Sequence, residues 1–269
     1  MTEADLRAEI DGAEAYEGLH VPALFGQWTA LVLDEAGVEA GHAVLDVACG
    51  TGVLARAAEE RVGASGSVTG IDPNPGMLAV AGRLSSAVTW TPGRAEALPA
   101  TDGSFDRAVS QFGLMFFVDR KAAVMEMLRV LEPGGRLAIA VWDSLDNTPA
   151  YARMVGLLDR MAGSKAAEAL TAPFVLGDRT AVEDLLVAAG CVDVRGTTVV
   201  GKGRFPSLHS MVEADLRGWL PVMGVHLEEE VIRAILAESK TVLAEFVRPD
   251  GRVEFDAPAH IVSGQRARV

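Results

Sequence analysis

Apolar positions along the chain alternate between short runs typical of buried strands and longer stretches with the spacing of one helical face. The strand-like runs lie at about 43–48, 67–71, 87–90, 106–110, 136–142, 192–200 and 253–263. The stretches with helical spacing lie at about 21–36, 53–60, 77–81, 120–131, 180–190, 207–220 and 227–247. Strands that alternate with helices in this way predict an α/β fold of the Rossmann type, with a seven-stranded, mostly parallel sheet and helices on both faces.

Local signals set several predicted helix ends. Pro22 suits a first helical turn, Asp119 is a predicted N-cap, and Thr180-x-x-Glu183 has the pattern of a capping box. Pro133-Gly134-Gly135 predicts a turn that stops the preceding helix. Residues 1–15 are polar and alanine-rich, so we expect them to be loose or marginally helical.

The regular alternation changes after Trp142, and this divides the predicted fold into two parts of one continuous domain. Residues 1–142 would form an N-terminal lid and a ligand-binding core. Residues 143–269 would complete the sheet and carry helical insertions at about 144–178 and 206–250. Ligands of open α/β sheets bind at the carboxyl ends of the strands, so we expect these insertions to fold over that edge as a cap.

The turn after the first predicted strand carries the main chemical signal. Asp46-Val47-Ala48-Cys49-Gly50-Thr51-Gly52 joins an apolar strand to a stretch with helical spacing. A strand, a glycine turn and a helix N-terminus together direct backbone N–H groups toward a ligand. Gly50-x-Gly52-x-x-Ala55 fits the dinucleotide fingerprint, and Asp72 follows Gly52 at the distance of a ribose-binding acid. A nicotinamide-dependent oxidoreductase is therefore one alternative.

Asp46 favours a different ligand. A carboxylate four residues before Gly50 would repel a pyrophosphate, whereas it would attract the ammonium group of an amino acid. The chain also lacks the Tyr-x-x-x-Lys pair of short-chain dehydrogenases at a matching place. The turn therefore favours S-adenosylmethionine (SAM), which carries an amino acid end and a ribose.

Composition narrows the range of partners. The formal net charge of the 269 residues is −13, which disfavours a nucleic acid partner. Cys49 and Cys191 are the only cysteines, and no metal-binding cluster is apparent, so no metal cofactor is expected. The N-terminus lacks a signal-peptide pattern and no apolar run could span a bilayer, so we expect a cytoplasmic protein without membrane insertion. The tail 265–268 is expected to be solvated.

Four motifs in order resemble class I SAM-dependent methyltransferases, and specifically the small-molecule enzymes of the ubiquinone/menaquinone-biosynthesis type. They are the turn at 46–52, Gly70-Ile71-Asp72-Pro73-Asn74-Pro75-Gly76-Met77-Leu78, Gly93-Arg94-Ala95-Glu96-Ala97-Leu98-Pro99 with Gly103-Ser104-Phe105-Asp106, and Arg129-Val130-Leu131-Glu132-Pro133-Gly134-Gly135-Arg136-Leu137. The resemblance covers about 21–142 well. It implies the class I methyltransferase fold, SAM as cofactor and S-adenosyl-L-homocysteine as product.

The resemblance also implies roles for particular residues. Asp46 and the backbone near Ala48 and Gly50 would hold the methionine end, and Asp72 would accept the ribose hydroxyls. The full set of implied cofactor-binding residues is Tyr16, Trp28, Asp46, Ala48, Gly50, Gly52, Asp72, Pro73, Met77, Ala95, Glu96 and Gln111. The chain departs from the family pattern at Ala48, where glycine is usual, and at Arg94, where an aspartate often accepts from the adenine amino group. Arginine cannot accept a hydrogen bond, so Glu96 or a backbone carbonyl would have to do so.

The acceptor is expected to be a small molecule, apolar or aromatic, methylated on oxygen or carbon. Ser110-Gln111-Phe112-Gly113 lacks the Asn/Asp-Pro-Pro-Tyr/Phe pattern of enzymes that methylate DNA bases. If the acceptor must lose a proton, His20 and Asp143 are the candidate bases. A non-catalytic SAM-binding protein is the second alternative. A monomer or a homodimer is expected, and the excess of arginine over lysine suggests a GC-rich genome and a place in secondary metabolism.

Overall fold

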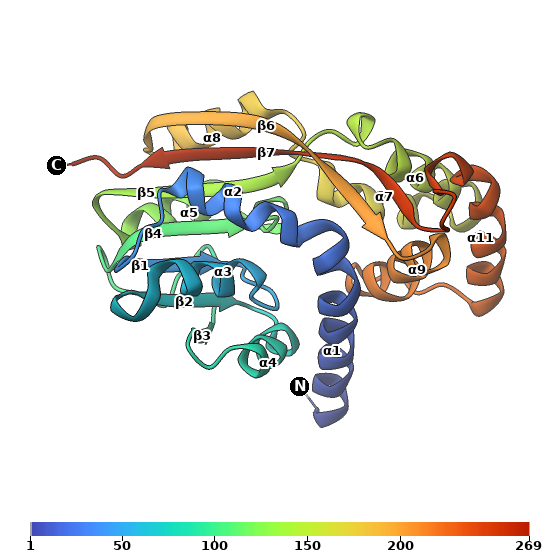
Figure 1. The fold of residues 1–269 in the computed structure, drawn as a ribbon, viewed down its shortest axis with the longest axis horizontal. Helices are drawn as coiled ribbons and strands as arrows, with labels where there is room; N and C mark the ends of the chain where they lie inside the picture. The colour runs from blue at the N-terminus through green and yellow to red at the C-terminus, as the bar shows by residue number, and fades with distance from the viewer. Residues whose placement is uncertain (1, 269) are drawn as a thin grey trace.

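The computed structural model describes residues 2–268, which form a seven-stranded sheet with the order β3-β2-β1-β4-β5-β7-β6 (Figure 1). The strands are β1 Ala43–Val47, β2 Ser67–Asp72, β3 Thr89–Pro92, β4 Phe105–Gln111, β5 Leu131–Trp142, β6 Val192–Phe205 and β7 Val253–Gln265. Strands β1 to β5 pair in parallel, whereas β7 runs antiparallel to both β5 and β6. The predicted seven-stranded, mostly parallel sheet is confirmed.

Helices cover both faces of this sheet. They are α1 Glu3–Ala15, α2 Thr29–Ala36, α3 Val53–Val62, α4 Pro75–Leu84, α5 Arg120–Val130, α6 Pro149–Ala162, α7 Ser164–Thr171, α8 Arg179–Ala188, α9 Leu208–Glu213, α10 Leu220–Val222 and α11 Glu229–Val242. Figure 1 shows α2 and α3 in front of the sheet and α5 and α8 behind it. Helices α6, α7, α9 and α11 gather on the right, beyond the ends to which the parallel strands point.

The caps of two helices test the predicted helix starts. Asp119 caps α5 as predicted, because its side chain accepts a hydrogen bond from the N–H of Ala122 at 2.9 Å. The predicted capping box at Thr180 is wrong. Asp178 is the N-cap of α8, and its carboxylate accepts from the N–H groups of Thr180 and Ala181. Asp178 has the extended backbone of an N-cap and an aspartate side chain, one of the strongest caps, so the helix begins earlier than the motif indicated.

The N-terminal segment is more ordered than the sequence indicated. Thr2 and Asp5 form a reciprocal capping box, and α1 is a regular helix. A π-helix, η1 (Tyr16–Phe25), and a short 3₁₀ turn, η2 (Gly26–Trp28), then lead into α2. Pro22 lies inside η1 and not in a first turn, which corrects the prediction. The wider π turn accommodates a residue that has no N–H to donate and whose ring would clash in an α-helix.

The segment Pro133-Gly134-Gly135 also differs from its prediction. It belongs to the start of β5, where the pairing with β4 shifts register between Phe105 and Arg107, and α5 has already ended at Val130. Gly134 has a φ of +84°, a conformation that glycine adopts without strain. The segment therefore forms an irregularity at the start of β5, where the regular pairing with β4 is interrupted.

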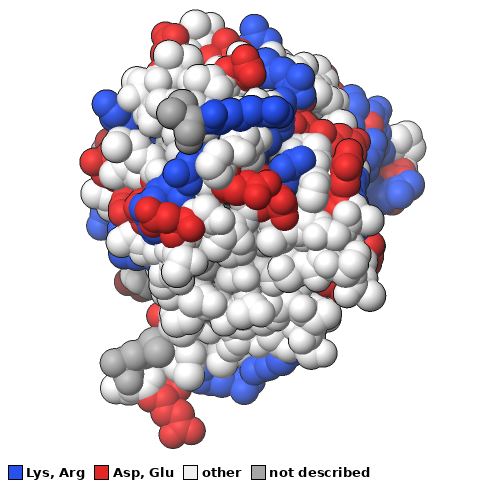
Figure 2. Space-filling view, turned by 90° about the vertical axis from the view of Figure 1, so that its left-hand side faces the viewer, with Lys and Arg blue, Asp and Glu red and all other residues white. Residues whose placement is uncertain are grey.

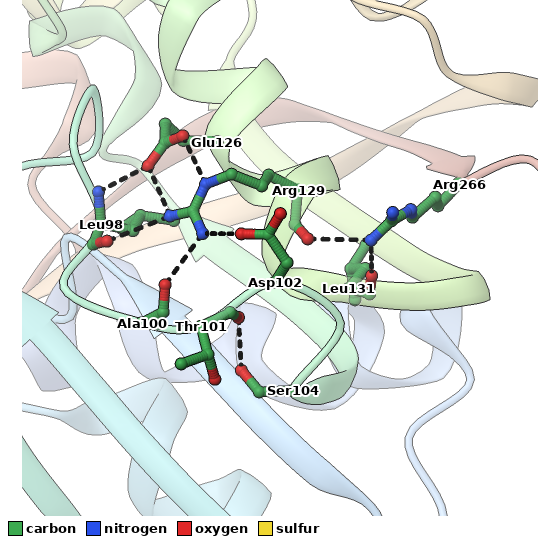
Figure 3. Close-up of polar contacts among 9 residues, drawn as sticks. All are labelled: Leu98, Ala100, Thr101, Asp102, Ser104, Glu126, Arg129, Leu131 and Arg266. Carbon is green, nitrogen blue, oxygen red and sulfur yellow. Dashed lines mark hydrogen bonds and ion pairs between the residues drawn. The ribbon is translucent and has the colours of Figure 1, made fainter.

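The C-terminal tail is bound to this region. Arg266 donates hydrogen bonds to the carbonyl oxygens of Arg129, at 2.8 Å, and Leu131, as Figure 3 shows. These carbonyls lie at the end of α5, where a cation is favourable. Beside them, the Arg129 guanidinium binds Glu126 and Asp102 and the carbonyls of Leu98 and Ala100 (Figure 3). The prediction of a solvated tail is therefore wrong for Arg266.

Gly76 allows α1 to lie close to α4. A Cβ atom at residue 76 would lie 2.5 Å from the backbone of Glu9. A small apolar cluster of Ile10, Ala13 and Val80, with Met77 packed against it, and the ion pair between Arg83 and Glu14 join the two helices. A side chain at residue 76 would force these contacts apart.

Gly76→Ala is expected to release α1 while leaving the sheet intact. We expect backbone amides of 3–15 to lose hydrogen-exchange protection by about tenfold or more, since local unfolding needs only a few contacts to be lost. Gly82→Ala is the matched control in the same helix, because its Cβ would meet nothing closer than 3.8 Å. Equal protection of 3–15 in both variants would contradict the prediction.

Candidate active site

Left-handed backbone shapes the turn between β1 and α3. Ala48, Gly50 and Gly52 have φ values of +59°, +55° and +87°. A Cβ at residue 52 would also lie 2.3 Å from the Trp90 ring, so glycine is required there on two grounds. Alanine stands at 48 where the family pattern usually has glycine. Its left-handed backbone costs about 1 kcal/mol for a residue that is not glycine.

Asp72 ties the end of β2 to this turn. Its Oδ2 accepts from the N–H of Gly50 at 2.9 Å, and its Oδ1 accepts from the N–H of Asn74 at 2.8 Å, across the exposed Pro73. Burial raises the pKa of Asp72, and these two hydrogen bonds oppose the rise. Each carboxylate oxygen has a further lone pair, so Asp72 can also accept from two hydroxyl groups.

A cavity of about 400 Å³, including its mouth, lies over the turn, and Asp46 and Gln111 are among the residues that line it. Neither carboxylate oxygen of Asp46 has a hydrogen-bond partner among the described residues, and nor has Oε1 of Gln111. Asp46 is 1% exposed. Burial, together with the nearby Asp72, raises the pKa of Asp46 to about 8. Once Asp46 is ionised, the site holds three buried acceptors that need donors, and an ammonium group has three donors.

The π-helix η1 borders this cavity, which we call the donor cavity. Tyr16 lines it from above, and burial raises the pKa of the Tyr16 hydroxyl well above its usual range. Glu17 anchors the segment, because it accepts hydrogen bonds from Thr51 at 2.5 Å and from Arg56 at 2.7 Å. The cover and the glycine turn are thus joined by polar contacts.

The predicted cofactor residues Met77, Ala95, Glu96 and Trp28 do not line this cavity. Met77 packs against the small cluster between α1 and α4, and Ala95 is buried in the main core. Glu96 accepts from the N–H of Val118 at 2.8 Å, and this bond, with other backbone N–H groups and Arg94, lowers its pKa against the opposing effect of partial burial. Trp28 is completely buried and lines neither this cavity nor the next.

A second cavity, of about 700 Å³ including its mouth, adjoins the first. Tyr16 and Phe112 line both cavities. Phe112 stacks on Trp142 with ring centroids 3.9 Å apart, and it has a φ of +57°, which is strained for a bulky residue. The side chains that line this second cavity are Tyr16, His20, Leu24, Phe25, Phe112, Phe116, Trp142, Thr148, Tyr151, Leu170, Pro173, Phe174, Asp215, Trp219 and Ala257.

The two candidate bases lie in different places. His20 lines the second cavity and faces Asp215, a residue that sequence reasoning missed. Asp143 lines neither cavity. Its carboxylate accepts from the N–H of Ser144 and from Asn147, and it lies 3.3 Å from Nε2 of His260. A lone aspartate in the otherwise apolar face of 208–222 was the available signal for Asp215.

Within residues 2–268, no three His, Cys, Asp or Glu side chains are grouped as metal ligands would be. No helix in this range has both the length and the apolar character needed to cross a bilayer.

Figure 2 shows the side of the molecule on the left of Figure 1, where basic and acidic side chains lie side by side in the upper half. Neither sign of charge dominates that face.

Comparison with known proteins gives matches to the first half of the chain. Residues 44–135 match the family described as "Methyltransferase domain". The ubiquinone/menaquinone biosynthesis C-methyltransferase of Hahella chejuensis is 42% identical over 119 residues, 42% of this chain and 47% of that protein. The chloroplastic 2-phytyl-1,4-beta-naphthoquinone methyltransferase of Arabidopsis thaliana is 37% identical over 47% of this chain and 53% of its own. The chain thus spans about half the length of the curated relatives it matches.

Solved structures share the fold over most of the chain. A putative methyltransferase from an antibiotic biosynthesis pathway of Anabaena variabilis superposes with a TM-score of 0.63 at 15% identity, covering 87% of this chain and 96% of its own. Phosphoethanolamine N-methyltransferase 2 of Haemonchus contortus, solved with S-adenosyl-L-methionine, gives a TM-score of 0.60 at 18% identity, covering 96% and 57%. The resemblance that the four motifs carried is thereby confirmed as a resemblance: residues 44–135 match a methyltransferase domain, and the fold is shared with solved methyltransferase structures.

Proposed function

We propose that this protein transfers a methyl group from SAM to a small acceptor that is apolar or aromatic, on oxygen or on carbon. The observation that carries the proposal is the set of unpaired acceptors on Asp46 and Gln111 in the donor cavity. A buried carboxylate without a partner is costly unless a cation meets it. The ammonium group of a methionine moiety supplies that cation.

SAM, when bound, supplies a methyl group on a positively charged sulfur. Asp46 and Gln111 would hold the amino acid end, and Asp72 would accept from the ribose hydroxyls. Tyr16 and Phe112 separate the two cavities and so lie where donor and acceptor would approach each other. The main tasks of the chain would be to align the two and to exclude water. The positions of Met77, Ala95 and Glu96 are compatible with an adenine subsite, which we keep as part of the proposal.

The acceptor class follows from the second cavity. Its walls are mainly aromatic, which suits a flat apolar molecule. Relatives named for menaquinone and naphthoquinone methylation support the same class. The net charge of −13 argues against a nucleic acid acceptor. We further propose that helices α6, α7, α9 and α11 act as the cap, and that the protein is cytoplasmic, monomeric or homodimeric, and serves secondary metabolism.

Calorimetric titration with SAM and with NADH tests the donor. We expect SAM to bind and NADH to bind at least about 100-fold more weakly, because a diphosphate would face the Asp46 carboxylate in a buried site. Tighter binding of NADH would favour the oxidoreductase. Radiolabelled methyl transfer to a panel of phenols, hydroquinones and polyketides is the second measurement. SAM binding without transfer to any of them would favour a non-catalytic SAM-binding protein.

A further inference from the structure

A buried histidine and a buried aspartate face each other in the wall of the second cavity. Nε2 of His20, in η1, lies 3.8 Å from Oδ1 of Asp215, in the π-helix η7 (Ala214–Trp219). Their side chains are 12% and 3% exposed. Two further polar atoms of the pair, Nδ1 of His20 and Oδ2 of Asp215, are buried and have no hydrogen-bond partner among residues 2–268.

The surroundings of this pair are aromatic. The cavity wall includes Phe25, Phe112, Phe116, Trp142, Phe174 and Trp219. The Tyr16 ring stacks on His20 with centroids 5.7 Å apart, and the Phe205 ring meets its edge at 6.5 Å. Unpaired polar atoms in an apolar cavity are costly, so their presence indicates a ligand that supplies the missing partner.

We propose that the acceptor is an aromatic compound with an ionisable hydroxyl group, that His20 accepts the proton of that hydroxyl, and that Asp215 positions the imidazole. This inference rests on the proposed methyl transfer and names its acceptor class. His20 is the catalytic residue because its Nδ1 would touch the acceptor. Asp215 is the positioning residue because it acts through Nε2 of the same ring.

The proposed step conserves atoms and electrons. The acceptor O–H bond breaks, and its proton moves to Nδ1 of His20. The acceptor oxygen forms a bond with the methyl carbon of the sulfonium donor, and the electron pair of the broken C–S bond returns to sulfur. The donor leaves as a neutral thioether, and His20 later returns its proton to water. No oxidant or reductant is needed.

The charges around the pair suit this role. Burial raises the pKa of Asp215, and His20 opposes the rise. Once His20 holds a proton, it forms an ion pair with Asp215, so no isolated charge is left in the apolar cavity. The other titratable groups that face the pair are Tyr16 and Tyr151. Burial raises the pKa of both hydroxyls well above the usual range, and Asp215 adds to the rise at Tyr151, so both stay neutral.

A coloured naphthol tests the proposal without depending on turnover. The neutral and ionised forms of 4-nitro-1-naphthol differ in visible absorbance, so the ionised fraction of the bound molecule can be measured. We expect the ratio of ionised to neutral form on the full-length protein to exceed that in buffer at the same pH by about tenfold, one unit of pKa. The measurement is made with and without S-adenosyl-L-homocysteine.

The variants separate the proton acceptor from a merely structural role. His20→Gln is expected to abolish the excess ionisation, and Asp215→Asn to reduce it. His260→Gln is the matched control. His260 is also buried beside an aspartate, Asp143, but both its ring nitrogens have partners, Thr198 and the Gly177 carbonyl, and it lines neither cavity. We expect His260→Gln to keep the excess ionisation.

Three results would overturn the proposal: no binding of the naphthol, no excess ionisation on the unaltered protein, or excess ionisation that survives in a folded His20→Gln. If His20→Gln does not fold, as judged by circular dichroism, the unaltered protein and Asp215→Asn still decide. If the unaltered protein binds SAM but does not increase naphthol ionisation, only this inference is refuted. If it increases naphthol ionisation but does not bind SAM, the proposed donor is refuted instead.

Discussion

Replacing Asp46 with asparagine is expected to weaken SAM binding by about 100-fold or more. Removal of one member of a buried charge pair typically costs about 3–5 kcal/mol, and each 1.4 kcal/mol is tenfold in affinity. Asparagine would also direct an N–H₂ donor toward the ammonium group. In the unaltered protein, affinity should rise as pH increases toward about 8, because Asp46 must ionise before it can pair. Calorimetry across this range should show no such rise in the variant.

The same substitution is expected to stabilise the protein in the absence of ligand. The folded pKa of Asp46, about 8, lies above its unfolded value, so the folded state holds a proton that the unfolded state has already lost. Stability therefore falls as pH rises from about 4 to 8, and the full penalty is present above 8. Asparagine carries no such penalty. Its melting temperature should exceed that of the unaltered protein most clearly at alkaline pH.

Asp159→Asn is the control for the Asp46 prediction. It makes the same side-chain replacement at an exposed site on α6, and we expect neither affinity nor stability to change. A variant at 46 that keeps its affinity for SAM would contradict both the prediction and the proposed function. A loss of affinity with no gain in stability would instead show that the carboxylate is already neutralised within the free protein.

Trp28→Ala is expected to lower the free energy of unfolding by about 3–5 kcal/mol, as large aromatic truncations in a core do. The indole is 0% exposed and packs edge-on against Phe112 and Trp142, each with a centroid distance of 6.0 Å. Strand β6 passes directly over it, since a Cβ at Gly201 would lie 2.3 Å from the ring. Urea denaturation followed by circular dichroism measures the loss.

The Trp28 variant also distinguishes a core residue from a wall of the donor site. We expect SAM affinity per folded molecule to change little, because Trp28 does not line the donor cavity. Leu31→Ala, at a side chain 37% exposed on α2, serves as control and should cost well under half as much, since a partly exposed leucine buries less apolar surface. A large loss of affinity with unchanged stability would contradict the core assignment.

Sequence patterns predicted the parts of the fold that depend on local spacing. The strand-turn-helix at 43–62 and the end of β2 at Asp72 follow from apolar runs that meet small residues, and the structure confirms both elements. The Asp119 cap was predictable for the same reason, because an N-cap acts on its own next residues. Asp46 could be recognised as a candidate ligand residue because it lies four residues before Gly50 in the same short segment.

The features that sequence did not predict depend on distant contacts or on unusual backbone. His20 and Asp215 meet across 195 positions of the chain, and no local pattern relates them. Pro22 lies inside the π-helix η1, whereas the apolar periodicity predicted an ordinary α-helix there. Trp28 had the spacing of a core residue, yet the resemblance suggested a donor wall, and its burial under β6 became visible only in the fold.

The ten-residue π-helix η1 contributes Tyr16 to both cavities and His20, Leu24 and Phe25 to the second. Movement of this helix would therefore open and close both chambers together. Such mechanical linkage predicts that both products depart after a common conformational step. Turnover would then be governed by the departure of products and not by the chemical step itself.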